Sequence, residues 1–119
     1  MSTPTLYRWS EVEAEQLNPL LTRQFVYGEQ AMVARFVLAK GAAVPTHSHH
    51  NEQLSMIVQG SLSFDFGDGD IRTVRAGEIL VIPANQPHSA IALEDTLAFD
   101  TFAPPRQDWI DKEDAYLRK

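Results

Sequence analysis

The feature that most constrains the fold is a succession of short extended segments that fills the chain after about residue 24. Within residues 32–38, apolar side chains recur at every second position, which is the period of a β-strand. Turn-forming residues separate the later segments, which we expect to be strands at 54–58, 62–66, 71–74, 79–82, 88–93 and 97–102. Many short strands at this spacing predict an all-β fold, either an antiparallel sandwich or a small barrel.

The two ends of the chain carry different signals. Ser10 and Glu13 form a capping-box pattern, which predicts the start of a short helix. Residues 107–119 favour a second helical segment, because Trp109, Ile110, Tyr116 and Leu117 can share one side of it. We expect this tail to pack against the barrel as a lid or flap.

Composition narrows the class of protein. A chain of 119 residues predicts one domain, spanning 1–119. The absence of cysteine excludes disulfides, cysteine-ligated zinc and thiol nucleophiles. A net charge of -6 argues against nucleic acid as a partner, because phosphate binding requires clustered Lys and Arg. The N-terminal sequence has no signal pattern, and no apolar run approaches the length of about 20 residues that spans a membrane. We therefore expect a cytoplasmic protein with no membrane contact.

The four histidines of the chain fall in two clusters, and three of them lie within residues 46–53. On a regular strand His47 and His49 would point to the same face, and so would Gln53, whereas His50 and Glu52 would point away. Imidazoles that converge inside a barrel need a polar partner, which a metal ion supplies. His88 follows a proline-bounded turn and can add a ligand from a neighbouring strand.

These residues lie in two patterns that resemble the paired motifs of the cupins. The first is Gly41-x5-His47-x-His49-x3-Gln53-x6-Gly60, and the second is Gly77-x5-Pro83-x-Asn85-x2-His88, with Asn85 where glycine is usual. The resemblance implies a single cupin, an antiparallel jelly-roll β-barrel with short irregular or helical ends and a metal site in its lumen. Most cupins have glutamate at the position of Gln53. Glu52 is one residue short in the spacing, so Gln53 is the expected ligand.

A ligand set without a carboxylate has an electrostatic consequence. Three imidazoles and an amide leave the charge of a divalent ion uncompensated, so the site should attract an anionic substrate and polarise its oxygen atoms. Nitrogen-rich sites suit Ni, Zn, Fe, Co or Mn, so the identity of the one divalent transition metal stays open.

A second group of candidate residues lies in the last strand and its exit. Alternation places Asp100 and Phe102 on one face, and Arg106 follows two prolines. If Asp100 faces the lumen, one interpretation is a buried ion pair with Arg106. The functional interpretation is that Asp100 moves a proton, Arg106 grips a carboxylate in its guanidinium fork, and Phe102 forms an apolar wall.

The pattern Asp100-x-Phe102-x-Pro104-Pro105-Arg106 together with Gln53 resembles the pectin degradation protein family, the KdgF-like small cupins. In that family, similar proteins convert 4,5-unsaturated monouronates from pectin or alginate breakdown to linear 5-keto-4-deoxyuronates. The resemblance implies an anionic sugar as the small-molecule partner. It also implies metal ligands at His47, His49, Gln53 and His88, and further active-site residues at Asp100, Phe102 and Arg106.

Two other functions remain open. A cupin with an open iron or nickel site can be a dioxygenase, and a cupin can also bind a uronate without catalysis. Small cupins are commonly dimers, and exposed strand edges give a physical reason for association, so we expect a homodimer.

Overall fold

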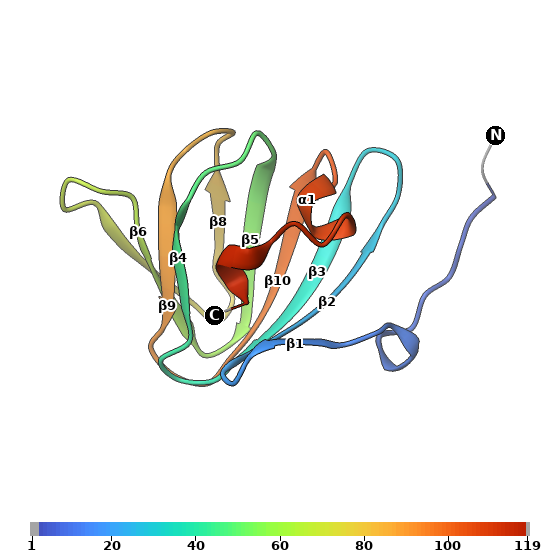
Figure 1. Cartoon of the computed structure of the whole chain (residues 1–119). Helices are drawn as coiled ribbons and strands as arrows, with labels where there is room; N and C mark the ends of the chain where they lie inside the picture. The colour runs from blue at the N-terminus through green and yellow to red at the C-terminus, as the bar shows by residue number, and fades with distance from the viewer. Residues whose placement is uncertain (1–2, 119) are drawn as a thin grey trace.

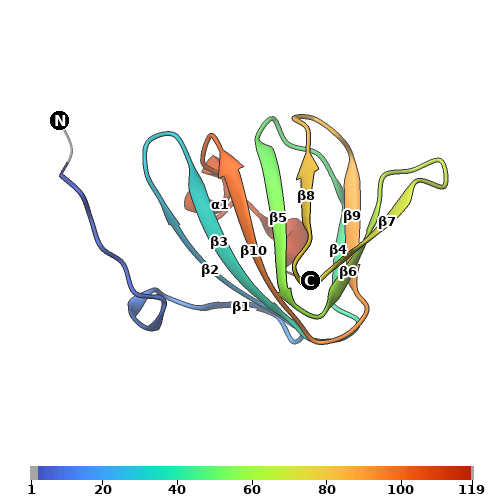
Figure 2. The same cartoon turned by 180° about the vertical axis from the view of Figure 1, so that it is seen from behind.

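The computed structural model describes residues 3–118 and confirms the all-β prediction with two antiparallel sheets. The larger sheet has the order β1-β2-β3-β10-β5-β8, and the smaller has the order β4-β9-β6-β7. The sheets face one another across a shared interior (Figures 1 and 2). Their strands are β1 (Glu15–Asn18), β2 (Leu21–Tyr27), β3 (Met32–Leu38), β4 (Ala43–His47), β5 (Glu52–Gln59), β6 (Ser61–Asp65), β7 (Ile71–Arg75), β8 (Ile79–Ile82), β9 (His88–Ala92) and β10 (Thr96–Ala103).

The core lies between the sheets and follows from alternation along each strand. In β3 the side chains at 32, 34, 36 and 38 are buried, and those between them are more exposed, as the pleat of a strand requires. Strand β10 lies between β3 and β5, with Asp100 opposite both Ala34 and Ser55. This register brings Asp100 to the inner face of the larger sheet.

Two turns require backbone conformations that few residues adopt. Gly60 connects β5 to β6 at φ 85°, and a Cβ atom at this position would collide with the backbone of Asp95 and Thr96, so glycine is required. Asn85 has φ 66°, a left-handed conformation that asparagine tolerates better than most residues. Asparagine can therefore replace the glycine that is usual at this position of the motif.

The predicted N-terminal helix is wrong. A single 3₁₀ turn, η1 (Trp9–Glu11), contains Ser10, and no side chain caps its start. The chain is extended again at Val12, and β1 then pairs with β2, so sheet pairing outweighs the local capping pattern. No helix within residues 3–118 is long and apolar enough to cross a membrane.

The C-terminal tail contains one turn of helix, α1 (Gln107–Ile110), and a 3₁₀ turn, η2 (Ala115–Leu117). Trp109 and Leu117 are buried, and the tail lies across the space between the two sheets (Figure 1). The Leu117 carbonyl accepts a hydrogen bond from the Asn18 amide at 3.2 Å. The expectation that the tail packs against the barrel is confirmed.

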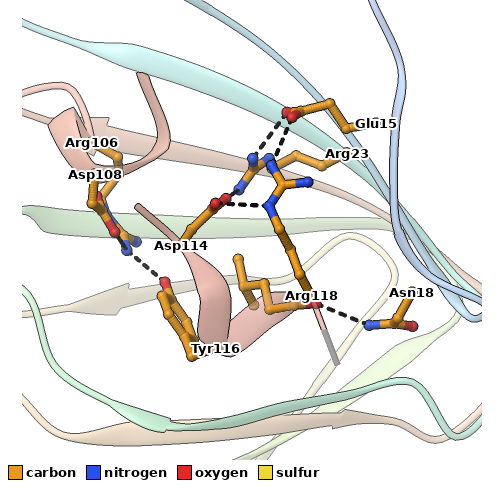
Figure 3. A network of polar contacts seen from close by, with 9 residues as sticks. Glu15, Asn18, Arg23, Arg106, Asp108, Asp114, Tyr116 and Arg118 are labelled. Carbon is orange, nitrogen blue, oxygen red and sulfur yellow. Dashed lines mark hydrogen bonds and ion pairs between the residues drawn. The ribbon is translucent and has the colours of Figure 1, made fainter. Parts of the chain in front are cut away.

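Buried ion pairs fasten the tail to the larger sheet (Figure 3). Arg23 on β2 contacts Asp114 at 2.7 Å and Glu15 at 2.9 Å, and its side chain is fully buried. Arg118 contacts the same two carboxylates, at 3.0 Å and 2.9 Å. Two cations thus share two anions, so the buried charge of Arg23 is compensated.

The outer face of β5 and the edge strand β8 carries apolar side chains. Those exposed are Met56, Val58, Ile79 and Val81. Apolar surface beside a strand edge favours association. The homodimer stays a prediction, which light scattering after size-exclusion chromatography tests.

Candidate metal centre

Three histidine rings converge at one end of the interior. His47 ends β4, His88 begins β9, and the two residues are paired across these strands. His49 follows in the connection to β5. One ring nitrogen from each residue lies within 4.8 Å of the others, a separation that a single bound ion can bridge.

Each imidazole is oriented by a backbone carbonyl two residues away. The Nδ1 atoms of His47, His49 and His88 contact carbonyl oxygens at 2.8, 3.0 and 2.8 Å; these belong to Pro45, Asn51 and Gln86 respectively. A carbonyl only accepts, so Nδ1 carries the proton and the lone pair lies on Nε2. The Nε2 atom of His88 is buried and has no hydrogen-bond partner among residues 3–118.

The surroundings keep these rings neutral. Burial lowers the pKa of His47 and of His49 to about 4, and the nearby positive charge of Arg106 acts in the same direction. Burial also lowers the pKa of His88. Neutral imidazoles can donate lone pairs to a metal ion near pH 7, which protonated rings cannot.

Gln53 turns its side-chain oxygen toward this cluster. Its Oε1 atom lies 3.1 Å from Nε2 of His49, while its Nε2 atom donates to Ser55 Oγ at 3.0 Å and to Asp100 Oδ2 at 3.2 Å. A neutral His49 has one N–H, so it cannot donate to both the Asn51 carbonyl and Gln53 Oε1. With Nδ1 donating to Asn51, both Nε2 of His49 and Oε1 of Gln53 present lone pairs to one another. A cation bound by these two atoms would remove this conflict, so the donor set fits a metal ion.

The structure distinguishes Glu52 from Gln53 as the candidate metal ligand. Gln53 is buried on the inner face of β5, whereas Glu52 and His50 are exposed. The regular strand assumed for residues 47–53 is wrong, because β4 ends at His47 and β5 begins at Glu52 in the other sheet. The intervening turn nevertheless returns Gln53 to the side of the histidines.

Asp100 faces the same interior from β10. The residue is half-buried, and its Oδ2 atom accepts a hydrogen bond from Gln53. Its Oδ1 atom is buried and has no hydrogen-bond partner among residues 3–118. Burial raises the pKa of Asp100 to about 7, although the Ser55 hydroxyl, Arg106 and Gln53 each oppose this rise. The carboxyl group can therefore exist in either protonation state near neutral pH.

The alternative of an ion pair between Asp100 and Arg106 is wrong. The Nε and Nη2 atoms of Arg106 donate to the carboxylate of Asp108 at 2.9 and 2.8 Å, and Nη2 also donates to the Tyr116 hydroxyl at 2.6 Å. Asp108 therefore occupies the guanidinium fork expected to hold a substrate carboxylate. The Nη1 atom has no hydrogen bond to any residue of 3–118.

Aromatic side chains form the wall beside Arg106. The buried Phe102 ring lies 4.9 Å from Trp109 and 5.7 Å from His49, measured between centroids. The guanidinium of Arg106 lies 5.2 Å from the Phe102 centroid and 4.6 Å from that of Trp109. These distances correspond to cation–π contacts, so the wall also holds the guanidinium in place.

A cavity of about 50 Å³ lies in the lumen. Among its lining residues are His47, His88, Gln53, Asp100, Phe102, Arg106 and Tyr116. Six of the seven residues expected at the site therefore line one cavity. The ring of the seventh, His49, lies 5.2 Å from that of His88 and 5.7 Å from that of Phe102, measured between centroids. Their roles as ligands or catalysts stay predictions.

Sequence reasoning missed two further residues of this site. Asn51 is 1% exposed, and its amide donates to the carbonyls of Pro104 and Pro105 at 2.6 and 3.2 Å. It thereby joins the histidine turn to the exit of β10. Tyr116 was expected only on one side of the C-terminal helical segment, and no local motif indicates its contact with Arg106.

The sequence matches the family described as Cupin domain over residues 34–100. Among solved structures, KdgF from Halomonas sp. has a TM-score of 0.80 and 27% identity, covering 88% of this chain and 99% of that one. An RmlC-like cupin from Shewanella frigidimarina has a TM-score of 0.81 and 27% identity, covering 90% and 96%. Nitrosourea synthase from Streptomyces achromogenes subsp. streptozoticus is 36% identical over 70 residues, which is 59% of this chain but only 15% of that protein.

Proposed function

The chain belongs to the cupin family, and we propose that it is a metal-dependent enzyme that opens the ring of 4,5-unsaturated monouronates. The products would be linear 5-keto-4-deoxyuronates. The likeness to KdgF over nearly the full length of both chains supports this choice. The observation that carries it is the combination, around one cavity, of neutral metal donors, a carboxyl group with a free oxygen, and a buried guanidinium.

The proposed metal donors are His47, His49, Gln53 and His88. A divalent ion held by these neutral groups would keep its full positive charge and act as a Lewis acid toward the oxygen atoms of an anionic substrate. The ring-nitrogen arrangement and the position of Gln53 Oε1 support this donor set.

The reaction needs a proton to be moved between two substrate atoms. As the C1–O5 ring bond breaks, the C1 hydroxyl loses its proton and an aldehyde forms at C1. O5 remains on C5 as an enolate, which becomes a ketone when C4 takes that proton. The product is an isomer of the substrate, so no oxidant or reductant is required.

We assign the movement of this proton to Asp100. Its Oδ1 atom is free of hydrogen bonds within residues 3–118, while Gln53 holds Oδ2. The carboxylate can accept the C1 hydroxyl proton and return a proton to C4, ending in the state in which it began. Phe102 provides an apolar wall against the sugar ring, and Arg106 offers its Nη1 atom to the substrate carboxylate.

Product analysis tests the proposed function. Purified protein with unsaturated galacturonate should give the linear 5-keto-4-deoxyuronate by NMR, faster than the ring opens in buffer and without oxygen uptake. The rate of ring opening with D100N should fall to the rate in buffer, because the amide cannot accept the proton. Full turnover by D100N would contradict the role of Asp100. Oxygen consumption would instead favour a dioxygenase, and binding without turnover would favour a uronate-binding protein.

A further inference from the structure

Tyr116 connects the C-terminal tail to the candidate site. Its ring lies 4.9 Å from the ring of His47, measured between centroids, with an angle of 33° between the planes. Its hydroxyl oxygen accepts a hydrogen bond from Nη2 of Arg106 at 2.6 Å. Tyr116 therefore contacts one proposed metal donor and one proposed substrate-binding residue.

The hydrogen bonds of this pair leave two donors without acceptors. Because the Tyr116 oxygen accepts from Arg106, its own proton is available, and no residue of 3–118 accepts it. The Nη1 atom of Arg106 likewise has no partner among these residues, since Asp108 and Tyr116 engage Nε and Nη2. Both residues line the cavity. A phenolic O–H and a guanidinium N–H beside one another favour an anionic ligand with two oxygens.

The position of Tyr116 is fixed by its neighbours in the tail. Asp114, two residues before it, is fully buried in its ion pair with Arg23, and Leu117, directly after it, is buried and bonded to Asn18. Figure 3 shows Arg106 and Asp108 beside Tyr116, with Arg23 and Asn18 lying away from them. A tail held in this way presents the hydroxyl group in a defined place, which lowers the entropic cost of binding a ligand.

The size of the cavity determines which part of a ligand can reach this pair. A volume of about 50 Å³ is well below the ~300–1,000 Å³ of pockets that enclose a whole organic ligand. A carboxylate group is small enough to enter this volume and to reach Tyr116 and Arg106, which both line it.

We propose that Tyr116 is a substrate-binding residue that donates its hydroxyl proton to the carboxylate of the ligand, while Arg106 Nη1 donates to the other carboxylate oxygen. The identity of the ligand as a uronate rests on the proposed function. Tyr116 is thus a specificity-determining residue, because the two donors discriminate an acid sugar from the neutral sugar of the same shape.

Calorimetric binding of two non-reacting sugars tests this assignment. Galacturonate carries the carboxylate, and galactose is its neutral counterpart. Y116F retains the ring against His47 and removes only the hydroxyl group. We expect Y116F to bind galacturonate roughly 10- to 100-fold more weakly than wild type, the range for a hydrogen bond to a charged group. Binding of galactose and metal content by elemental analysis should not change.

Y7F is the matched control, because Tyr7 is exposed in the N-terminal segment, and it should bind galacturonate as wild type does. Unchanged galacturonate affinity in Y116F would overturn the assignment, and so would an equal loss for galactose, which would make Tyr116 a packing residue. Equal affinity of wild-type protein for both sugars would overturn it as well. The binding measurement is independent of turnover, so a wild type that selects galacturonate but opens no ring would contradict only the proposed function.

Discussion

The side-chain oxygen of Gln53 lies 3.1 Å from Nε2 of His49, although His49 already uses its Nδ1 atom on the Asn51 carbonyl. A neutral imidazole has one proton for these two acceptors. The conflict disappears if a cation lies between Gln53 and His49. The amide nitrogen of the same Gln53 holds Asp100, so one side chain links the proposed metal donors to the proposed proton carrier.

Replacing Gln53 by glutamate separates these two functions of the residue. Q53E retains an oxygen donor, so metal content should remain near one ion per chain. Turnover should fall roughly 10- to 100-fold, because the carboxylate cannot donate to Asp100 and repels it. Elemental analysis and steady-state kinetics measure the two effects. Q59E is the control, since Gln59 is exposed on the same strand; equal activity of Q53E and Q59E would contradict this prediction.

Two histidines of the chain offer a matched test of the metal donors. His88 is buried with a free Nε2 atom, whereas His50 is exposed. Loss of a group that only orients a metal ligand weakens metal binding by about 10- to 100-fold. H88A removes a proposed direct ligand, so it should weaken metal binding at least as much. H50A should bind metal as wild type does. Titration with Zn²⁺ after chelation measures both affinities, and similar values for the two variants would exclude His88 from the donor set.

Asp114 contributes to stability through the buried charge of Arg23. In D114N that guanidinium keeps only Glu15 as an anionic partner, so we expect a loss on the order of 3 kcal/mol in the free energy of unfolding. Urea denaturation at pH 7 measures this loss. D111N makes the same change at an exposed position and should cost less than about 0.5 kcal/mol. Equal stability of the two variants would contradict the proposed anchoring of the tail.

The same ion pairs predict how stability depends on pH. Burial alone would raise the pKa values of Glu15 and Asp114, but hydrogen bonds and charges from Arg23 and Arg118 outweigh it and lower both. A carboxylate with a lowered pKa in the folded state stabilises the fold above its unfolded pKa and loses that effect as pH falls through the folded value. Stability should therefore decrease below about pH 4, near the ordinary values of these groups. Thermal denaturation between pH 3 and 6 should show a smaller decrease for D114N than for wild type.

Strand alternation and turn spacing predicted seven of the ten strands within residues 3–118, and motif spacing grouped the candidate residues. The strands β1, β2 and β4 were not predicted. The inward position of Gln53 also followed from its spacing to His49, although the chain changes sheets between β4 and β5. The ends were harder to predict, because sheet pairing outweighed the capping pattern at Ser10. Asp108 was not predicted as the partner of Arg106. It is only two residues away, but the contact depends on the turn into α1. Tyr116 lies between Asp114 and Leu117, which contact strands distant in the sequence, so no local pattern indicates its position.

The most direct test of the central claim is the rate at which the protein removes the double-bond ultraviolet absorbance of unsaturated galacturonate. The assay compares purified protein, chelated protein and chelated protein reloaded with metal against the spontaneous rate in buffer. We predict acceleration by purified protein, loss of it on chelation, and recovery on reloading. A rate no faster than buffer in the reloaded protein, with metal content shown to be one ion per chain, would contradict the ring-opening function.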